Sequence, residues 1–190
     1  MNYETKIAML LQVAKEQLSY TNYIGKYAIE HGYRNLDTSA PRDKFYKNAN
    51  IAFFHESLLA TFSLLDNDVR VISFFNWPEF MAQKSIEIKA IKKKFANYGF
   101  VILRNQVVAH LDNANSLNRM PNVRQTAMMS EEITERLMEI INDLTNLFHE
   151  YTDQYSSRYT RDLFDTAAVE AQLADIMEAA QPTMTHNPVI

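Results

Sequence analysis

The segment from Ile102 to Asp112, ILRNQVVAHLD, holds the residue types with the greatest chemical potential in this sequence. Arg104 and Asn105 are adjacent, and His110 follows six residues after the arginine. The planar guanidinium of an arginine matches a phosphate group, and an imidazole exchanges a proton near neutral pH. The segment therefore combines a group that can hold an anion with one that can act as an acid or a base.

A helix over this segment would place the two charged groups on different sides. Successive residues of an α-helix are about 100° apart around the axis and rise by about 1.5 Å each. An apolar stripe then consists of Phe100, Leu103, Val107 and Leu111. Arg104 falls on one flank of this stripe and His110 on the other, about 120° and about 9 Å apart. One helix does not easily bring both to a single phosphate, whereas a two-fold axis could bring a set from each of two chains to one cleft.

Each of these residues also has a purely structural interpretation. Arg104 would pair with a carboxylate, Asn105 would be solvated, and His110 would be a hydrogen-bonded residue at the edge of the core. The residues alone leave both interpretations open.

Most other kinds of site are missing from the sequence. There is no cysteine, which excludes disulfides, cysteine nucleophiles, zinc fingers and iron–sulfur clusters. The motifs G-x-S-x-G, H-E-x-x-H, Walker A and the EF-hand loop do not occur. None of the five histidines has another histidine three or four residues away, so a helical metal site has little support. We expect neither a metal nor a cofactor.

The pattern R-N-x-x-x-A-H resembles the signature of the HEPN superfamily (higher eukaryotes and prokaryotes nucleotide-binding). The leucine before Arg104 and the ending A-H-x-D, up to Asp112, are similar to the abortive-infection, AbiU-type branch. The resemblance covers about eleven residues specifically and the rest of the chain only loosely. It implies an HEPN-like, up-and-down bundle of about five to six helices.

The resemblance further implies a metal-independent RNA endonuclease in prokaryotic defence or a toxin–antitoxin system. Arg104 would hold the scissile phosphate, His110 would act as general base or acid, and Asn105 would orient His110 or the phosphate by hydrogen bonding. RNA is the implied substrate because its 2′-hydroxyl is the nucleophile. A homodimer with a composite site is implied too, with an antitoxin or a nucleotidyltransferase as a further partner.

Two alternatives remain. The first is a non-catalytic module that binds a nucleotide, RNA or a partner protein, because the superfamily also contains inactive members. The second is a helical scaffold whose match to the motif is accidental. A nuclease needs Arg104 and His110 in one cleft, whereas a scaffold would bury them in separate ion pairs.

Supporting roles fall on residues outside the motif. His55 and Glu56 interrupt an apolar stretch and are either a second layer around the motif or a hydrogen-bonded pair at the core. The run Lys92, Lys93 and Lys94 either lines an approach for RNA or solvates a helix face. Asp112 would support the motif. The net charge of −4 sums a basic stretch before and within the motif and an acidic C-terminal part, so it does not exclude RNA.

The elements that must position these residues are all helical. Only three glycines and five prolines occur in 190 residues, which disfavours sandwiches, barrels and glycine-rich phosphate loops and favours an all-α fold. Residues 69–77 predict a short helix or an irregular packed segment, and loops are expected at 33–44 and 114–129. Periodicity and helix breakers predict helices over about 3–31, 45–65, 78–97, 100–113, 130–153 and 161–180.

We expect residues 1–155 to form the bundle, 156–180 to add a C-terminal amphipathic helix and 181–190 to be a flexible tail. The N-terminus lacks the features of a signal peptide, and no apolar run is long enough to span a membrane. The sequence thus predicts a cytoplasmic protein without a membrane partner.

Overall fold

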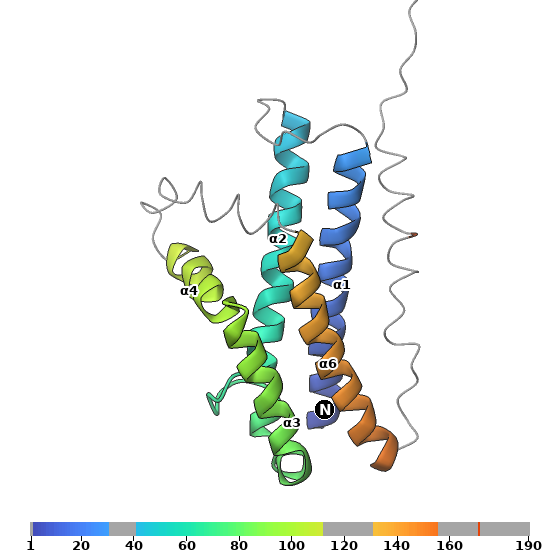
Figure 1. Cartoon of the computed structure of the whole chain (residues 1–190), viewed down its shortest axis with the longest axis vertical. Coiled ribbons are helices and arrows are strands. Elements are labelled where there is room, and N and C mark those ends of the chain that lie inside the picture. Colours follow the sequence, from blue (N-terminus) through green and yellow to red (C-terminus); the bar gives the residue numbers. More distant parts are fainter. Residues whose placement is uncertain (1, 31–40, 112–130, 156–170, 172–190) are drawn as a thin grey trace, which may run out of the picture.

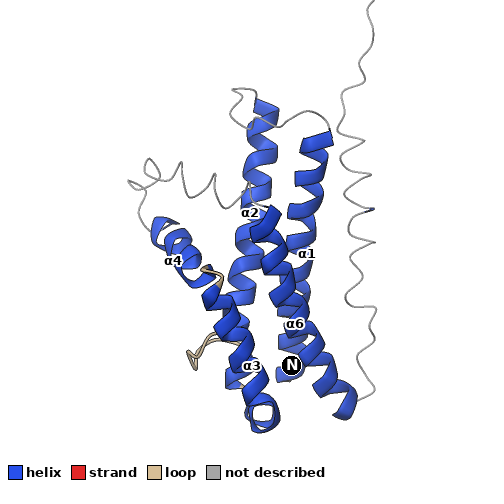
Figure 2. Ribbon diagram, in the orientation of Figure 1, coloured by secondary structure: helices blue, strands red, loops and turns tan. Residues whose placement is uncertain are grey.

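A computed structural model of the chain describes residues 2–30, 41–111, 131–155 and 171. Within them, 28–30, 41–47, 106–111, 131 and 153–155 are described by their backbone alone. This part of the chain is an all-α helical bundle and contains no strand (Figure 2). Its elements are α1 (Tyr3–Glu30), α2 (Pro41–Leu64), the 3₁₀ turn η1 (Phe74–Asn76), α3 (Pro78–Asn97), α4 (Phe100–Leu111) and α6 (Glu131–Tyr155).

The helices alternate in direction. In Figure 1, α1 runs upward from the N-terminus, α2 returns, α3 and α4 run upward again, and α6 runs downward. The largest helix–helix contact is between α1 and α2, and α6 packs against both α1 and α3. Two hydrogen bonds tie α1 to α2, from Ser57 Oγ to the carbonyl of Ala14 at 2.6 Å and from Asn50 Nδ2 to the carbonyl of Thr21 at 2.8 Å.

The core follows from apolar residues at helical spacing. On α1 the fully buried stripe recurs every three or four residues, and α6 carries a similar stripe. Their members are Ile7, Leu11, Ala14 and Leu18 on α1, and Leu137, Ile140, Ile141, Leu144 and Phe148 on α6. An aromatic cluster closes one end of the core, where Trp77 stacks on Phe80 at 5.5 Å and meets Tyr151 at 4.9 Å.

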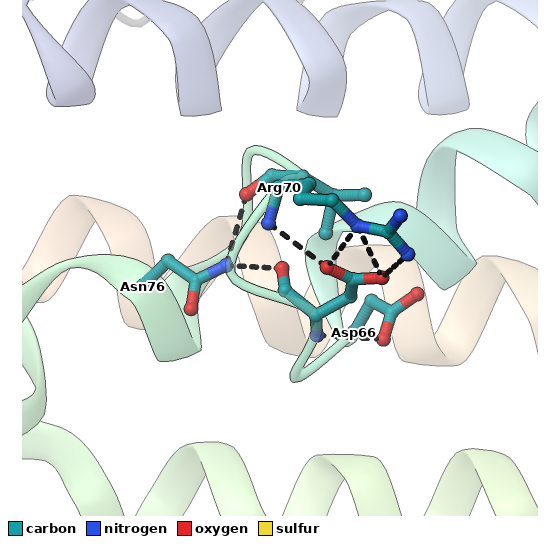
Figure 3. A network of polar contacts seen from close by, with 5 residues as sticks. Asp66, Arg70 and Asn76 are labelled. Atoms are coloured by element: carbon teal, nitrogen blue, oxygen red, sulfur yellow. Dashed lines mark hydrogen bonds and ion pairs between the residues drawn. The ribbon is translucent and has the colours of Figure 1, made fainter.

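The connection between α2 and α3 is an ordered loop. Asp68 accepts hydrogen bonds from the backbone and side chain of Arg70, and Asn76 donates to the carbonyls of Asp68 and Val71 at 2.7 and 2.9 Å (Figure 3). The loop ends in η1 and is followed by Pro78 at the start of α3, where a proline loses no hydrogen bond. The predicted short helix or irregular packed segment over 69–77 is confirmed.

One glycine separates α3 from α4. Gly99 has a φ of +80°, a left-handed conformation that often ends helices. Glycine adopts it easily because it has no Cβ. Its N–H bonds to the carbonyl of Ala96 at 2.9 Å, and its own carbonyl accepts from Leu103 at 3.0 Å as α4 begins. Gly99 therefore sets the direction in which α4 leaves α3, and α4 leans outward from the bundle in Figure 1.

The predicted loop over 33–44 is wrong for its last four residues. The helix α2 begins at Pro41, because the first position of a helix tolerates proline without loss of a hydrogen bond. Residues 33–40 of that loop, the predicted loop at 114–129, the C-terminal helix at 161–180 except residue 171, and the tail at 181–190 lie outside the described residues. No helix in the described ranges is long and apolar enough to cross a membrane.

Candidate functional site

The motif residues lie on α4, which begins directly after Gly99. Arg104 is half-buried and Asn105 is exposed. His110 belongs to the last turn of α4, but its side chain lies outside the described residues, as does all of Asp112. The structure therefore describes the side chains of Arg104 and Asn105, whereas the placement of the His110 side chain stays a prediction.

The side chain of Arg104 extends from α4 to α2. The central carbon of its guanidinium is 4.3 Å from the centre of the Phe62 ring on α2, a distance typical of a cation–π contact. Nη1 donates a hydrogen bond to Oδ1 of Asn105 at 3.1 Å. Nε is buried and has no hydrogen-bond partner among the described residues. The side chain is thus fixed on one face by a ring and along one edge by its neighbour.

Arg104 differs from the other arginines whose side chains are described. Arg70 pairs with Asp68, and Arg136 pairs with Glu132 four residues before it on α6. No carboxylate within the described part of the chain forms an ion pair with Arg104. The scaffold interpretation expected such a pair, and its absence among these residues leaves a half-buried cation whose charge is not balanced there.

The three consecutive lysines on α3 do not form one surface. Lys92 donates to Oδ1 of Asn67 at 2.9 Å and lies 4.7 Å above the ring of Phe75, and burial lowers the pKa of its ammonium. Lys93 is exposed and has no ion-pair partner among the residues that the structure describes. Successive residues are about 100° apart on a helix, so adjacent lysines point to different neighbours.

Lys94 faces α6. Its ammonium lies 2.7 Å from Oδ2 of Asp143 and 2.6 Å from Oε1 of Glu139, and the Asp143 hydrogen bond raises its pKa above the ordinary lysine value. Tyr98 donates to Oε2 of Glu139 at 2.6 Å. The pKa of Glu139 is lowered, mainly because it accepts from Lys94. The ion pairs of Lys94 and the hydrogen bond of Tyr98 hold the end of α3 against α6.

The basic stretch and the acidic stretch are therefore neighbours. Lys84, near the start of α3, also reaches α6, with its ammonium 3.1 Å from Oε2 of Glu150. Two of the basic groups before the motif thus balance acids of α6. The free positive charge next to the motif is smaller than the sequence suggested.

His55 and Glu56 do not form a buried pair. His55 is half-buried on α2 with its ring centre 6.4 Å from that of Phe54, whereas Glu56 is exposed. His55 precedes Phe62 by seven residues, which places both on one side of α2 about 10 Å apart along the axis. His55 thus shares the side of α2 that meets Arg104, and a supporting role for it stays a prediction.

Phe62 is the residue that sequence reasoning missed. It lies in the apolar run of α2, where neighbouring positions look equally suited to the core. Only the packing of α4 on α2 singles it out, so no local signal could have identified it.

Across the described ranges, no group of three or more His, Asp or Glu side chains could hold a metal ion.

Comparison with known proteins adds no relative. No protein-family model, curated protein or solved structure matches the chain. The likeness of the α4 motif to the HEPN signature consequently remains a resemblance carried by residues 102–112.

Proposed function

We propose that this protein is a metal-independent RNA endonuclease of the HEPN type, in which Arg104 holds the phosphate and His110 transfers the proton. One observation carries the proposal. Arg104 is half-buried on Phe62, and among the described residues its Nε has no acceptor and no carboxylate forms an ion pair with it. A guanidinium in this state favours an anion, and its fork is suited to the oxygens of a phosphate.

The cleavage step uses the substrate's own nucleophile. The ribose 2′-oxygen forms a bond to the adjacent phosphorus, and the bond from phosphorus to the 5′-oxygen breaks. A base accepts the 2′-hydroxyl proton and an acid donates a proton to the leaving 5′-oxygen, both tasks within the range of an imidazole. Arg104 would stabilise the charge on the phosphate oxygens as the bonds change.

A homodimer would complete the site. By helix geometry Arg104 and His110 belong to opposite flanks of α4 and are about 9 Å apart along it. A two-fold axis perpendicular to this helix, passing between the two positions, would bring each arginine level with the partner chain's histidine. Ile102, in the first turn of α4, is 65% exposed and offers an apolar contact on the same helix. Asn105, which accepts from Arg104, would hold the guanidinium in place within each chain.

The approach of RNA would rest mainly on Lys93. It is the exposed member of the lysine run, whereas Lys92 and Lys94 already bind Asn67 and the acids of α6. A contact between Lys93 and a phosphate would weaken as salt rises. A role in prokaryotic defence or a toxin–antitoxin system, with an antitoxin or nucleotidyltransferase as partner, rests on the HEPN resemblance alone.

The test compares one RNA oligonucleotide with DNA of the same sequence, both in EDTA. We expect the wild type to cut only the RNA and to leave 2′,3′-cyclic phosphate ends. Arg104→Ala should slow cleavage by about 10²-fold, the usual loss when one transition-state donor is removed. Arg136→Ala, which removes an arginine that is already paired, is the matched control and should cleave normally. Cleavage of DNA, or cleavage abolished by EDTA, would contradict the proposal.

The non-catalytic module is the second candidate, and the ion pairs of the lysines favour it. With Lys84 and Lys94 engaged by α6, the positive surface near the motif is narrow. RNA binding that depends on Arg104 but occurs without cleavage would identify this alternative.

A further inference from the structure

Phe62 lies between an arginine and the aromatic core. One neighbour of its ring is the guanidinium of Arg104, at 4.3 Å, and the other is the ring of Phe95 on α3, at 6.4 Å. Phe95 is buried, and its ring centre lies 5.1 Å from that of Phe100, the first residue of α4, with the two ring planes tilted. The ring of Phe62 is thus held by the same core that holds the start of the motif helix.

We propose that Phe62 is a positioning residue for Arg104, an aromatic platform that turns the Nη end of the guanidinium toward an RNA phosphate. This inference rests on the proposed function for its ligand but not for the contact between the two side chains. It adds to the motif a residue from a different helix, at a distance of 42 positions in the sequence.

The contacts of Arg104 determine which donors remain for a ligand. The ring of Phe62 covers one face of the planar group, and the buried Nε cannot reach water or a described acceptor. Nη1 is oriented by Asn105. The remaining N–H donors are on Nη1 and Nη2, so an oxyanion would meet the end of the guanidinium rather than its Nε edge.

The energetics also favour a binding role over a stabilising one. A buried N–H without an acceptor opposes folding, and the attraction to the ring only partly offsets it. Arg104 would be an unfavourable choice for a structural contact, where Leu or Met would fill the same space. A bound phosphate supplies the missing negative charge, while a platform fixed in advance reduces the entropy lost on binding.

The experiment follows Arg104 directly and then measures binding. In the wild type, ring current should shift the Nε–H proton resonance of Arg104 upfield, and burial should slow its exchange with water. Phe62→Leu keeps an apolar side chain but removes the ring, and Phe62→Tyr restores the ring. Phe53→Leu is the matched control, because Phe53 is a half-buried phenylalanine of the same helix whose ring contacts Tyr20 at 5.1 Å.

Binding is measured with a 2′-O-methyl RNA oligonucleotide, which lacks the nucleophile and stays intact. We expect Phe62→Leu to lose the upfield shift and to weaken binding about fivefold, the change expected for one partly desolvated cation–π contact. Phe62→Tyr should recover both, and Phe53→Leu should change neither. In Arg104→Ala, a further Phe62→Leu substitution should have no added effect, because the platform acts through the arginine.

Two results would overturn the inference. If the Arg104 resonance is unchanged in Phe62→Leu, the ring does not position the guanidinium. If Phe62→Leu and Phe53→Leu bind RNA equally well, the platform does not serve the phosphate. A wild type that shows the shifted resonance but binds no RNA would instead refute the proposed function, and with it the ligand of the platform, while the contact with Phe62 would stand.

Discussion

The ammonium of Lys94 on α3 lies 2.6 Å from a carboxylate oxygen of Glu139 on α6. The other oxygen of Glu139 accepts a hydrogen bond of 2.6 Å from the hydroxyl of Tyr98. Tyr98 is the residue directly before Gly99. This contact fixes the end of α3 at the point where the chain turns into α4. The helix that carries Arg104 is therefore anchored from α6 as well as from α2.

Lys94→Met should lower the free energy of unfolding by about 1 kcal/mol, the upper range for a partly exposed ion pair, because Lys94 bridges two acids. Lys93→Met is the matched control, since Lys93 is exposed and engaged by no described residue, and its effect should stay within about 0.5 kcal/mol. Urea unfolding followed by the fluorescence of Trp77, the only tryptophan, measures both. Equal effects of the two substitutions would show that the ion pairs of Lys94 contribute nothing to stability.

Gly99→Ala should destabilise the fold by roughly 1–2 kcal/mol through backbone strain, because φ is +80° although space for a Cβ is free within 4 Å. Gly25→Ala tests the opposite case. A Cβ there would meet Asn50 Nδ2 at an ordinary 3.8 Å inside α1, so the gain in helix propensity should stabilise by up to about 1 kcal/mol. Thermal unfolding of both variants gives the comparison, and a Gly99→Ala protein as stable as the wild type would contradict the turn geometry.

Asp68 should titrate at unusually low pH. The hydrogen bond from the Arg70 side chain lowers the pKa of this carboxyl to about 2. The pKa of Asp68 in the folded protein lies below its ordinary value. The contact between Asp68 and Arg70 therefore contributes fully to the free energy of unfolding above a pH of about 4, and this contribution is lost as the pH falls toward about 2. In a carbon NMR titration, Arg70→Gln should raise the midpoint of Asp68 toward the ordinary value, whereas Arg136→Gln should not. A wild-type midpoint already near 4 would refute the contact in solution.

Helix boundaries were predictable where the chain carries its own breaks. Pro78 and Gly99 bracket α3, so the sequence places both of its ends correctly. Pro41 misled because a proline is as compatible with the first turn of a helix as with a loop. Choosing between them depends on the packing of α2 on α1, which the local sequence does not contain.

The candidate site was predictable only along its own helix. The helical position of Arg104, Asn105 and His110 was predicted and agrees with α4, which spans Phe100–Leu111. The hydrogen bond from Arg104 to Asn105 at 3.1 Å was not predicted. Phe62 could not be predicted, because its contact with Arg104 exists only once α4 packs on α2. For the same reason, the sequence could not predict that the three lysines do not form one surface. Lys94 pairs with Glu139 on α6, and Lys92 donates to Asn67 in the loop before α3.

The most direct test of the central claim is cleavage of total RNA by the purified protein in EDTA, with wild type and His110→Ala side by side. Cleavage by the wild type that ignores the chelator and is lost in His110→Ala is the predicted result. If a folded wild-type protein leaves a broad range of RNAs intact, or if His110→Ala cuts as fast as the wild type, then α4 does not carry a nuclease site.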